Sequence, residues 1–394
     1  MSGIKTINDF SIKGKKLLVR VDINTSIING KPQISDRIIA HGKTIKVLCS
    51  KGAAVVVLAH QGRPKQNDCI SLEQHCKLLK RYAKIRFVKD TAGNDAVKAI
   101  KNLKKKEAIL LENTRFLKEE HGFHFRNKFI SNIAPLIDIF VLDAFSVSHR
   151  NDTSITGFSK RLPSCMGPVM EKEYENFNII KEKTKKPFVI CLGGLKIHDY
   201  FGVMDYYLKN KSVDKILTCG ALGELVLIAK GKMLGKKQEF LDKLGLLSLL
   251  PKVKSILSKH QESIRSLVDI AVDNEGKRMD LPVWELPVRA MIYDIGGKTA
   301  SNYSKEIMKA KTVFIKGTPG AYERKGFGLG TKKIFEAAAR SNAFTVIGGG
   351  DSTSALRIFK IKESKFNYIS LSGGALLKYL AGERLPGLEA LSKK

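Results

Sequence analysis

The sequence predicts an α/β fold with two doubly wound, largely parallel-sheet domains joined by a helix. Short, continuous runs rich in Val, Ile, Leu and Phe recur along the chain, and runs of this kind are typical of strands buried on both faces. Helical patterns lie between many of the runs, as crossover connections between parallel strands require. Most runs are followed directly by glycine or by polar side chains, where parallel sheets bind their ligands.

Ten strands are expected in chain order: Leu17–Ile23, Ala53–Ala59, Ala108–Leu111, Ile137–Leu142, Phe188–Leu192, Lys215–Thr218, Met291–Ile295, Thr312–Ile315, Phe344–Ile347 and Tyr368–Leu371. Helices are expected between them at Ile38–Ser50, Ser71–Tyr82 and Thr331–Arg340. The wide gap between the fourth and fifth runs holds a charged helical pattern, Met170–Lys183. We interpret this pattern as the helix that joins the two domains, each with about half of the strands.

The composition favours a globular cytoplasmic protein. At 394 residues and 43% hydrophobic content, the chain can bury two separate cores. No apolar run approaches the length of a membrane span, and the start, MSGIKTINDF, lacks a signal-peptide core, so no membrane insertion is expected. The six cysteines form no CxxC pair and no regular framework, which favours reduced thiols in a cytoplasm.

The formal net charge of +31 is unusual for a chain of this kind. Such a field attracts phosphorylated metabolites, and it also predicts non-specific binding of polyanions such as nucleic acid. The lysines are spread over the whole length instead of forming one stripe, which favours a solvated basic surface over a dedicated polyanion site.

In the first half, the runs lead into polar and basic side chains that include the segments His60-Gln61-Gly62-Arg63 and Glu112-Asn113-Thr114-Arg115. A single arginine here has an ordinary alternative role as a surface salt-bridge partner. Four of them at successive strand ends instead predict a pocket for a small, multiply anionic molecule, because guanidinium groups match carboxylates and phosphates. The candidate binding residues are Asp22, Asn24, Arg37, His60, Gln61, Gly62, Arg63, Arg115 and Arg150.

In the second half, the runs end in glycine, and these glycines predict a backbone cradle for phosphates. The clearest case is the segment TVIGGGDSTSAL at 345–356, which predicts a strand, a glycine turn and a helix start, with Asp351 placed to hold Mg²⁺ against the phosphates. Lys196 follows Gly193-Gly194 and could reach a transferring phosphoryl group, and Glu323 could accept hydrogen bonds from a ribose. A solvent-exposed lysine and a turn carboxylate are the alternatives for these two residues. The two halves together indicate direct phosphoryl transfer, which depends on positioning, positive charge and exclusion of water.

With these residues in place, the chain resembles the phosphoglycerate kinase family, and its spacing is most similar to that of the archaeal members. The resemblance covers nearly the whole length, and its motifs occur in order. They are LLVRVDINTSI, ISDRI, LAHQGRP, LLENTRF, VLDAFSVSHR, LPSCMGPVMEKE, LGGLKIHDY, IYDIGGKT, KGTPGAYE, VIGGGDS and SGGALLKYLAGERLPGLEAL.

The resemblance implies reversible phosphoryl transfer between ATP and 3-phosphoglycerate, giving ADP and 1,3-bisphosphoglycerate, with Mg²⁺ and closure of the two domains. It implies that residues 1–167 bind phosphoglycerate, that residues 168–379 bind nucleotide, and that residues 380–394 return to the first domain. Arg37, Lys196 and Gly373 are the implied catalytic residues. The implied nucleotide-binding residues are Lys196, Glu323, Gly349, Gly350, Asp351 and Ser352, with Asp351 as the metal ligand. A monomer is expected, with a dimer as the alternative.

The chain departs from the family pattern mainly in its nucleotide half, at Gly297, Lys316, Ser372 and Tyr200. The departures concern nucleotide affinity and preference more than the reaction, and Lys316 is a candidate for an additional phosphate contact. A catalytically weakened phosphoglycerate- or polyanion-binding protein on the same scaffold is the alternative function. The retained arginine set and Asp351 favour the enzyme.

Overall fold

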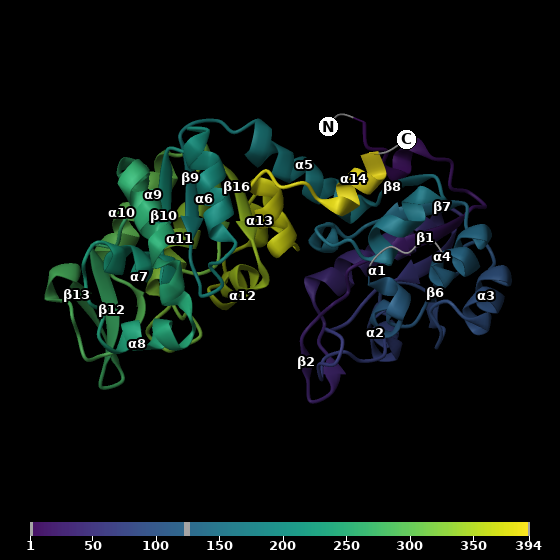
Figure 1. Cartoon of the computed structure of the whole chain (residues 1–394), viewed down its shortest axis with the longest axis horizontal. Coiled ribbons are helices and arrows are strands. Elements are labelled where there is room, and N and C mark those ends of the chain that lie inside the picture. Colours follow the sequence, from purple (N-terminus) through teal and green to yellow (C-terminus); the bar gives the residue numbers. More distant parts are fainter. Residues whose placement is uncertain (1–2, 122–126, 393–394) are drawn as a thin grey trace. The chain divides into compact units, whose positions relative to one another are not determined.

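The computed structural model describes residues 3–121 and 127–392, and the chain divides into two compact units. Unit 1 comprises Met1–Glu175 and Arg384–Lys394, and unit 2 comprises Asn176–Glu383. The division falls inside helix α5 (Pro168–Glu182), which confirms the expected joining helix (Figure 1). No helix among the described residues is long and apolar enough to cross a membrane.

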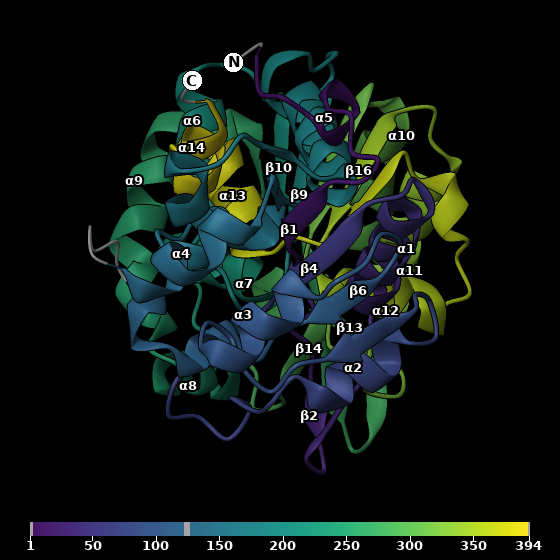
Figure 2. The same ribbon diagram turned by 90° about the vertical axis from the view of Figure 1, so that its right-hand side faces the viewer.

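Unit 1 contains a six-stranded, entirely parallel sheet in the order β5-β6-β4-β1-β7-β8. The strands are β1 (Lys16–Arg20), β4 (Ala54–Leu58), β5 (Ile85–Phe87), β6 (Ala108–Leu110), β7 (Ile139–Leu142) and β8 (Ser164–Met166). The helices are α1 (Asp36–Ser50), α2 (Glu73–Leu79), α3 (Asn94–Lys101), α4 (Lys128–Ile133) and α14 (Pro386–Ser392). A short hairpin, β2 (Ile27–Ile28) and β3 (Lys31–Pro32), precedes α1. Figure 2 shows the neighbouring strands β1, β4 and β6.

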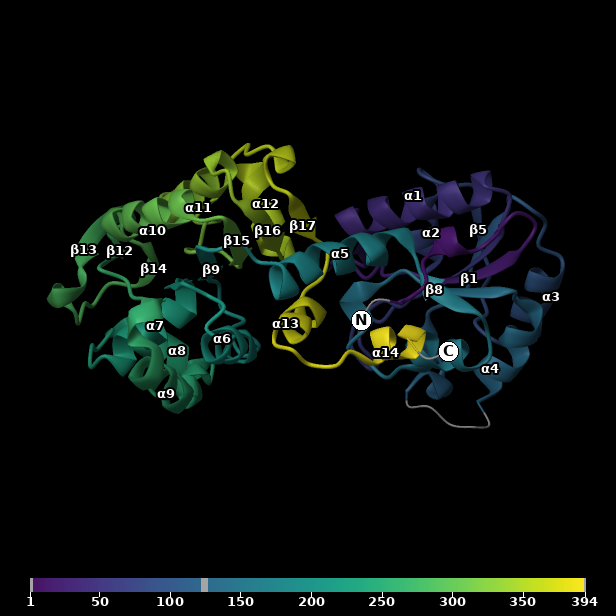
Figure 3. The ribbon, with the colours of Figure 1, turned by 90° about the horizontal axis from the view of Figure 1, so that it is seen from above.

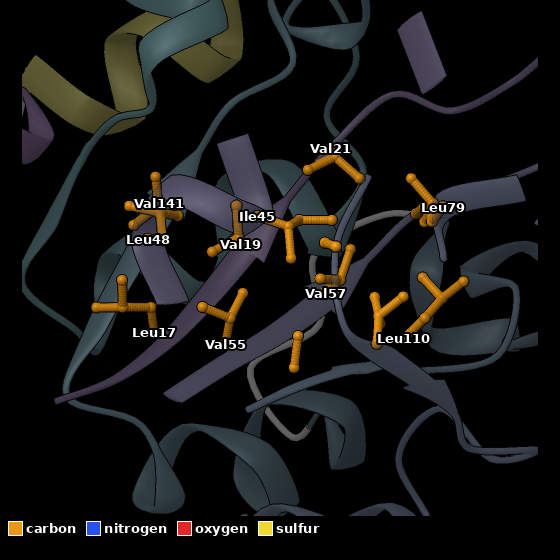
Figure 4. Packing of buried hydrophobic residues seen from close by; sticks show 14 of the residues in the cluster. Leu17, Val19, Val21, Ile45, Leu48, Val55, Val57, Leu79, Leu110 and Val141 are labelled. Carbon is orange, nitrogen blue, oxygen red and sulfur yellow. The ribbon is translucent and has the colours of Figure 1, made fainter. Parts of the chain in front are cut away.

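The unit 1 sheet is buried on both faces, which explains why its strands are continuously apolar. Alternate side chains such as Leu17, Val55 and Val141 join a core with α1 and α2 (Figure 4). On the other face, Phe140 packs against Phe158, which makes an edge-to-face contact with Phe129 of α4 at 5.1 Å between ring centroids. Helices on both faces confirm the doubly wound class.

Unit 2 contains a second six-stranded parallel sheet in the order β11-β10-β9-β15-β16-β17. The strands are β9 (Phe188–Leu192), β10 (Lys215–Thr218), β11 (Ile264–Arg265), β15 (Thr312–Lys316), β16 (Phe344–Gly348) and β17 (Tyr368–Ser370). The helices are α6 (Tyr200–Lys209), α7 (Gly220–Ala229), α8 (Lys236–Lys243), α9 (Leu250–His260), α10 (Gly297–Lys309), α11 (Leu329–Arg340), α12 (Gly350–Ile358) and α13 (Gly374–Leu380). Helices α10 and α11 pack side by side (Figure 3).

One expected strand belongs to a different sheet. The run Met291–Ile295 forms β14 (Ile292–Ile295), but this strand pairs antiparallel with β12 (Asp269–Asn274), which also pairs with β13 (Lys277–Pro282). Glu275 and Gly276 join β12 to β13 with positive φ values of 51° and 79°, as a two-residue hairpin turn requires. Strand β13 is polar, and the apolar part of β12 is limited to Ile270, Ala271 and Val272. The sequence analysis therefore missed both strands, together with the short strands β2, β3, β5, β8 and β11.

Asp143, at the end of β7, connects three elements of unit 1. Its fully buried carboxylate accepts hydrogen bonds from the backbone N–H groups of Val169 and Met170 at 2.7 and 3.1 Å, which caps the start of α5. Its second oxygen lies 3.1 Å from Nδ1 of His41 on α1. The same carboxylate therefore fixes both α1 and α5 to the end of a central strand.

His75 on α2 holds the turn that follows β4. Its Nε2 lies 3.0 Å from Oε1 of Gln61, and Gln61 accepts a further hydrogen bond from the backbone of Thr25. Since the amide oxygen is an acceptor, Nε2 carries the proton. Burial lowers the pKa of His75 to about 4, so the imidazole is neutral in the folded protein at neutral pH.

We predict that Asp143→Ala lowers the free energy of unfolding by about 3 kcal/mol, because two helix-start donors and a buried histidine lose their acceptor. Asp143→Asn is the matched control, since its amide oxygen still accepts from the cap, and about half of that loss is expected. Chemical denaturation of both variants measures the difference. Equal losses of unfolding free energy in Asp143→Ala and Asp143→Asn would show that the hydrogen bonds to the start of α5 do not account for the destabilisation.

We predict that stability falls between pH 7 and pH 5 partly through His75. The pKa of the histidine is near 6.5 in the unfolded chain and about 4 in the folded protein. Between pH 7 and pH 5 the unfolded state therefore binds more protons than the folded state, and the free energy of unfolding falls as the pH is lowered. The contribution is about 2 kcal/mol at pH 5. Denaturation across this range compares the wild type with His75→Gln, whose profile should be shallower by that amount. His198→Gln alters an exposed histidine and is the control. An equal change in the pH dependence of its unfolding free energy would contradict the assignment of this dependence to His75.

Candidate functional site

The carboxyl edge of the unit 1 sheet gathers the residues that the sequence analysis selected for an anionic ligand. Asp22 follows β1 and is buried, and its Oδ2 pairs with Nη1 of Arg37 at 2.8 Å. Arg37 stands in the first turn of α1 and keeps 27% of its side chain exposed. Its guanidinium is thus anchored on one side and accessible on the other, as a phosphate- or carboxylate-binding arginine must be.

Asp22 is ionised despite its burial. Burial acts to raise its pKa, but the charge of Arg37, a hydrogen bond from Ser146 and the charge of Arg20 together hold the pKa well below its usual range. The carboxylate thereby offsets part of the positive charge that surrounds it. Its other oxygen accepts the backbone N–H of Asn24 at 3.0 Å, which shapes the loop after the strand.

His60 lies beside several positive charges. Burial lowers its pKa well below the usual value, and the nearby charges of Arg20, Arg150 and Arg115 lower it further while Asp22 opposes them. Its Nδ1 lies 3.0 Å from Nη2 of Arg20, which makes this nitrogen the acceptor and leaves the proton of the neutral ring on Nε2. His60 can therefore donate one hydrogen bond to an anionic ligand without adding a charge.

Arg63, Arg115 and Arg150 complete the basic group. The charges of Arg115 and Arg63 both act on Arg150, whose pKa is lowered first by burial, so the three guanidinium groups lie within electrostatic reach of one another. Arg63 is exposed, whereas the Arg115 side chain is only 9% exposed and pairs with Asp152 at 3.2 Å. The Nε of Arg115 is buried without a hydrogen-bond partner. An anion between these arginines would relieve their mutual repulsion.

Asn24, Gln61 and Gly62 shape the site mainly through the backbone. The Asn24 side chain accepts the N–H of Gly62 at 2.8 Å, and Gln61 bonds the backbone of Thr25 in both directions at 3.0 and 3.1 Å. Gly62 has φ 73°, and a Cβ there would overlap the backbone of Asp68. The side chain of Gln61 is fully buried, so its contribution is to hold the loops.

Several supporting residues were not predicted from the sequence. Arg20 is fully buried in β1 and bonds Ser154, which in turn donates to Glu120 at 2.7 Å. Asn113 was noted only as a strand-end residue, but its amide bonds the backbone of Gln61 twice, at 2.9 and 3.2 Å. The one available signal for Arg20 was a charged residue inside an otherwise apolar run, LLVRVDI.

In unit 2, the glycine turns after β9, β10 and β15 pack directly on one another. The N–H groups of Gly193 and Gly194 donate to the carbonyls of Lys316 and Thr318 at 2.9 and 2.8 Å. A Cβ on Gly317, which has φ 76°, would overlap the carbonyl of Gly193. Only glycine permits this close approach. The hydroxyl of Tyr200 donates to the Gly193 carbonyl at 2.7 Å, so this departure from the family pattern secures the turn.

The turn after β16 is formed as the sequence predicts, with Gly349 at φ 97° leading into α12. The side chain of Lys316, from the neighbouring strand β15, extends along this turn, and a Cβ on Gly349 would overlap its Nζ. The ammonium group therefore lies close to the backbone of Gly349. Ser352 is buried and donates back to the carbonyl of Gly348 at 3.1 Å, which places it as a structural residue of the helix start.

Asp351 and Glu323 are exposed carboxylates that lie near the same hydroxyl group. Burial raises the pKa of Tyr322 to about 12, and the charges of Glu323 and Asp351 add to the shift. Tyr322 and Glu323 also line a pocket of about 350 Å³ together with Arg324, Lys332 and Phe359. Lys196 is exposed after the Gly193-Gly194 turn, and Gly373 precedes α13 in open space.

The described residues contain no group of three or more His, Cys, Asp and Glu side chains that could hold a metal ion by themselves. A Mg²⁺ ion at a phosphate site usually keeps several waters and needs only one or two protein carboxylates. The exposed carboxylate of Asp351 in the first turn of α12, beside the glycine turn, fits that requirement.

Comparison with known proteins agrees with this arrangement. The sequence profile of the family described as Phosphoglycerate kinase matches residues 7–383. The phosphoglycerate kinase of Methanopyrus kandleri is 39% identical over 395 residues, covering 98% of this chain and 97% of that protein, and that of Saccharolobus solfataricus is 40% identical over 399 residues, covering 99% and 97%.

Two solved structures are similar over almost their whole length. The phosphoglycerate kinase structure from Pyrococcus horikoshii OT3 has a TM-score of 0.90 at 35% identity and covers 98% of both chains. The one from Coxiella burnetii has a TM-score of 0.83 at 28% identity and covers 99% of both. Sequence, fold and the arrangement of charged and glycine-rich strand ends all agree, and the chain belongs to the phosphoglycerate kinase family.

Proposed function

We propose that this enzyme transfers a phosphoryl group reversibly between ATP and 3-phosphoglycerate, giving ADP and 1,3-bisphosphoglycerate, as a step of glycolysis and gluconeogenesis in the cytoplasm. The observation that carries the proposal is the basic group around the Asp22–Arg37 pair, which matches an acceptor with both a carboxylate and a phosphate. The glycine turns of unit 2 supply the corresponding phosphate cradle. All six cysteines are free thiols, which supports a reducing compartment.

The acceptor is held in unit 1 by Arg63, Arg115 and Arg150, with hydrogen bonds from His60 and the Asn24 region. Arg37 binds the carboxylate end and stabilises the charge on the phosphoryl group in transit, because Asp22 fixes its guanidinium in place. A carboxylate oxygen of 3-phosphoglycerate attacks the γ-phosphorus while the bond from that phosphorus to the ADP oxygen breaks. No protein nucleophile is needed.

The nucleotide is held in unit 2. The backbone at Gly349 and Gly350 contacts phosphates, Glu323 accepts from the ribose, and Lys196 together with the backbone at Gly373 stabilises the phosphoryl group. Asp351 would hold Mg²⁺, and the bound ion would neutralise phosphate charge. Ser352 supports this turn from within the helix. We further propose that closure of the two units excludes water during direct transfer.

We predict that Arg37→Ala lowers kcat/KM at least about 100-fold in a coupled assay with 3-phosphoglycerate, ATP and Mg²⁺. Arg37→Lys is the matched control and should retain part of the activity, because it keeps a charge beside Asp22 but loses the guanidinium fork.

Asp351→Ala should raise the Mg²⁺ concentration needed for half-maximal rate. A wild type that binds 3-phosphoglycerate but shows no transfer with any nucleotide would establish the alternative, a binding protein on this scaffold.

We predict that Lys316→Asn weakens ATP and ADP binding about tenfold, the usual effect of losing one charge-assisted hydrogen bond. Lys311→Asn is the control, since this exposed lysine precedes the opposite end of the same strand, β15. Titration calorimetry measures both affinities. Unchanged nucleotide affinity in Lys316→Asn would exclude a phosphate contact from this residue.

A further inference from the structure

The loops before the central strands of unit 1 carry lysines that the proposed reaction does not use. Six exposed lysines, here named the basic edge, stand directly before β1, β4 and β6. They are Lys13, Lys15, Lys51, Lys104, Lys105 and Lys106. Because all strands of this sheet are parallel, their amino ends share one edge, opposite the carboxyl edge that holds Asp22 and Arg37.

The strand register arranges the basic edge as a row. It aligns Ile85, Ala108, Val55, Leu17 and Ile139 across the sheet, each close to the amino end of its strand. Lys84, which is exposed before β5, continues the row at one end. Arg161, before β8, is separated from the row by β7, which Ile137 and Asp138 precede. Strands lie about 4.8 Å apart, so the lysines before β5, β6, β4 and β1 extend over roughly 14 Å.

Backbone hydrogen bonds connect the three loops of the basic edge. Gly14 donates to Gly52 at 3.0 Å, Lys106 donates to Ala53 at 2.8 Å, and Ala54 donates to Lys15 at 2.9 Å. The aliphatic end of Lys105 lies beside Gly14, where an added Cβ would come within 3.3 Å of its Cε. The lysines are therefore presented from fixed positions on adjacent loops.

Nearby acids offset little of this charge. Asp138 receives the backbone N–H of Lys16 at 2.7 Å and forms a partly exposed ion pair with Lys15 at 3.5 Å. Glu107 accepts the backbone N–H of Lys104 at 3.1 Å. An exposed ion pair of this kind contributes little free energy. The basic edge thus keeps a net positive charge along its length.

The chemistry of the three loops favours one class of partner. The segments 13–15, 51–53 and 104–107 contain no aromatic residue, so they offer no stacking surface for unpaired bases. None of the large hydrophobic side chains exposed in the described part of the chain lies in these loops, so they also lack the apolar anchors of a membrane-binding surface. A row of lysines matches the regularly spaced phosphates of a double helix, and roughly 14 Å corresponds to about four base-pair steps.

We propose that the basic edge binds the phosphate backbone of a double-stranded nucleic acid without reading its sequence. The site lies at the edge of the sheet opposite the candidate phosphoglycerate site, and binding there leaves that site accessible. Sequence-independent binding of this kind depends on the release of counterions from the duplex.

The test measures binding of the full-length protein to a labelled DNA duplex of about 20 base pairs by fluorescence anisotropy over a range of salt concentrations. One variant changes all six lysines of the basic edge to Gln, and a second changes them to Arg. The control removes the same charge from unit 2, by Gln at the exposed positions Lys230, Lys236, Lys243, Lys254, Lys259 and Lys305. A duplex RNA of equal length and vesicles of anionic lipid are the comparison ligands.

The Gln variant of the basic edge should lose affinity at least about 100-fold at low salt, with a shallower salt dependence, because each phosphate contact contributes about 0.9 to the slope. The Arg variant should bind as the wild type does, and phosphotransferase activity should be unchanged in all variants, which also reports that they are folded. An equal loss in the unit 2 control would overturn the proposal in favour of a diffuse charge effect. Loss of vesicle binding with duplex binding intact would overturn it in favour of a lipid surface.

Discussion

Parallel pairing places the carboxyl end of every strand at the same edge of its sheet, and both candidate sites depend on that constraint. In unit 1, it brings Asp22, His60 and Arg115 together although they follow three different strands. In unit 2, it brings the turns at Gly193, Gly317 and Gly349 together in the same way. Sheet order therefore decides which strand ends meet at each candidate site.

The concentration of positive charge in unit 1 needs compensation even without a ligand. Arg20 is buried inside the sheet, and burial lowers its pKa while the charges of Glu120 and Asp22 oppose the shift. The Ser154 hydroxyl links Arg20 to Glu120 through bonds of 3.0 and 2.7 Å. Asp22 and Asp152 place further carboxylates beside Arg37 and Arg115 of the candidate site. The candidate site thus keeps a net positive charge, while the buried Arg20 is paired.

Unit 2 uses shape more than charge. Its turns approach so closely that side chains at Gly193, Gly220 or Gly317 would overlap neighbouring backbone atoms, so these positions accept only glycine without rearrangement. Charge enters at a few points around the turns. Lys316 reaches the turn at Gly349. Asp351 follows Gly349 and Gly350 in the sequence and stands in the first turn of α12. This division fits a ligand whose phosphates are recognised mainly by backbone groups.

The sequence by itself determined the α/β class, the joining helix and the side chains at the strand ends, because continuous apolar runs and abrupt glycine or polar ends are local features. It could not identify the antiparallel sheet around β12, because β12 has only a short apolar stretch and β13 is polar, and their pairing through the hairpin turn at Glu275 and Gly276 is seen only in the structure. Nor could it assign Arg20, Asn113 or Tyr200, since their partners lie on other strands and loops. Strand order and register decide which of these groups meet. For that reason only the tertiary structure showed that lysines scattered through the sequence form one row at the amino edge of the unit 1 sheet.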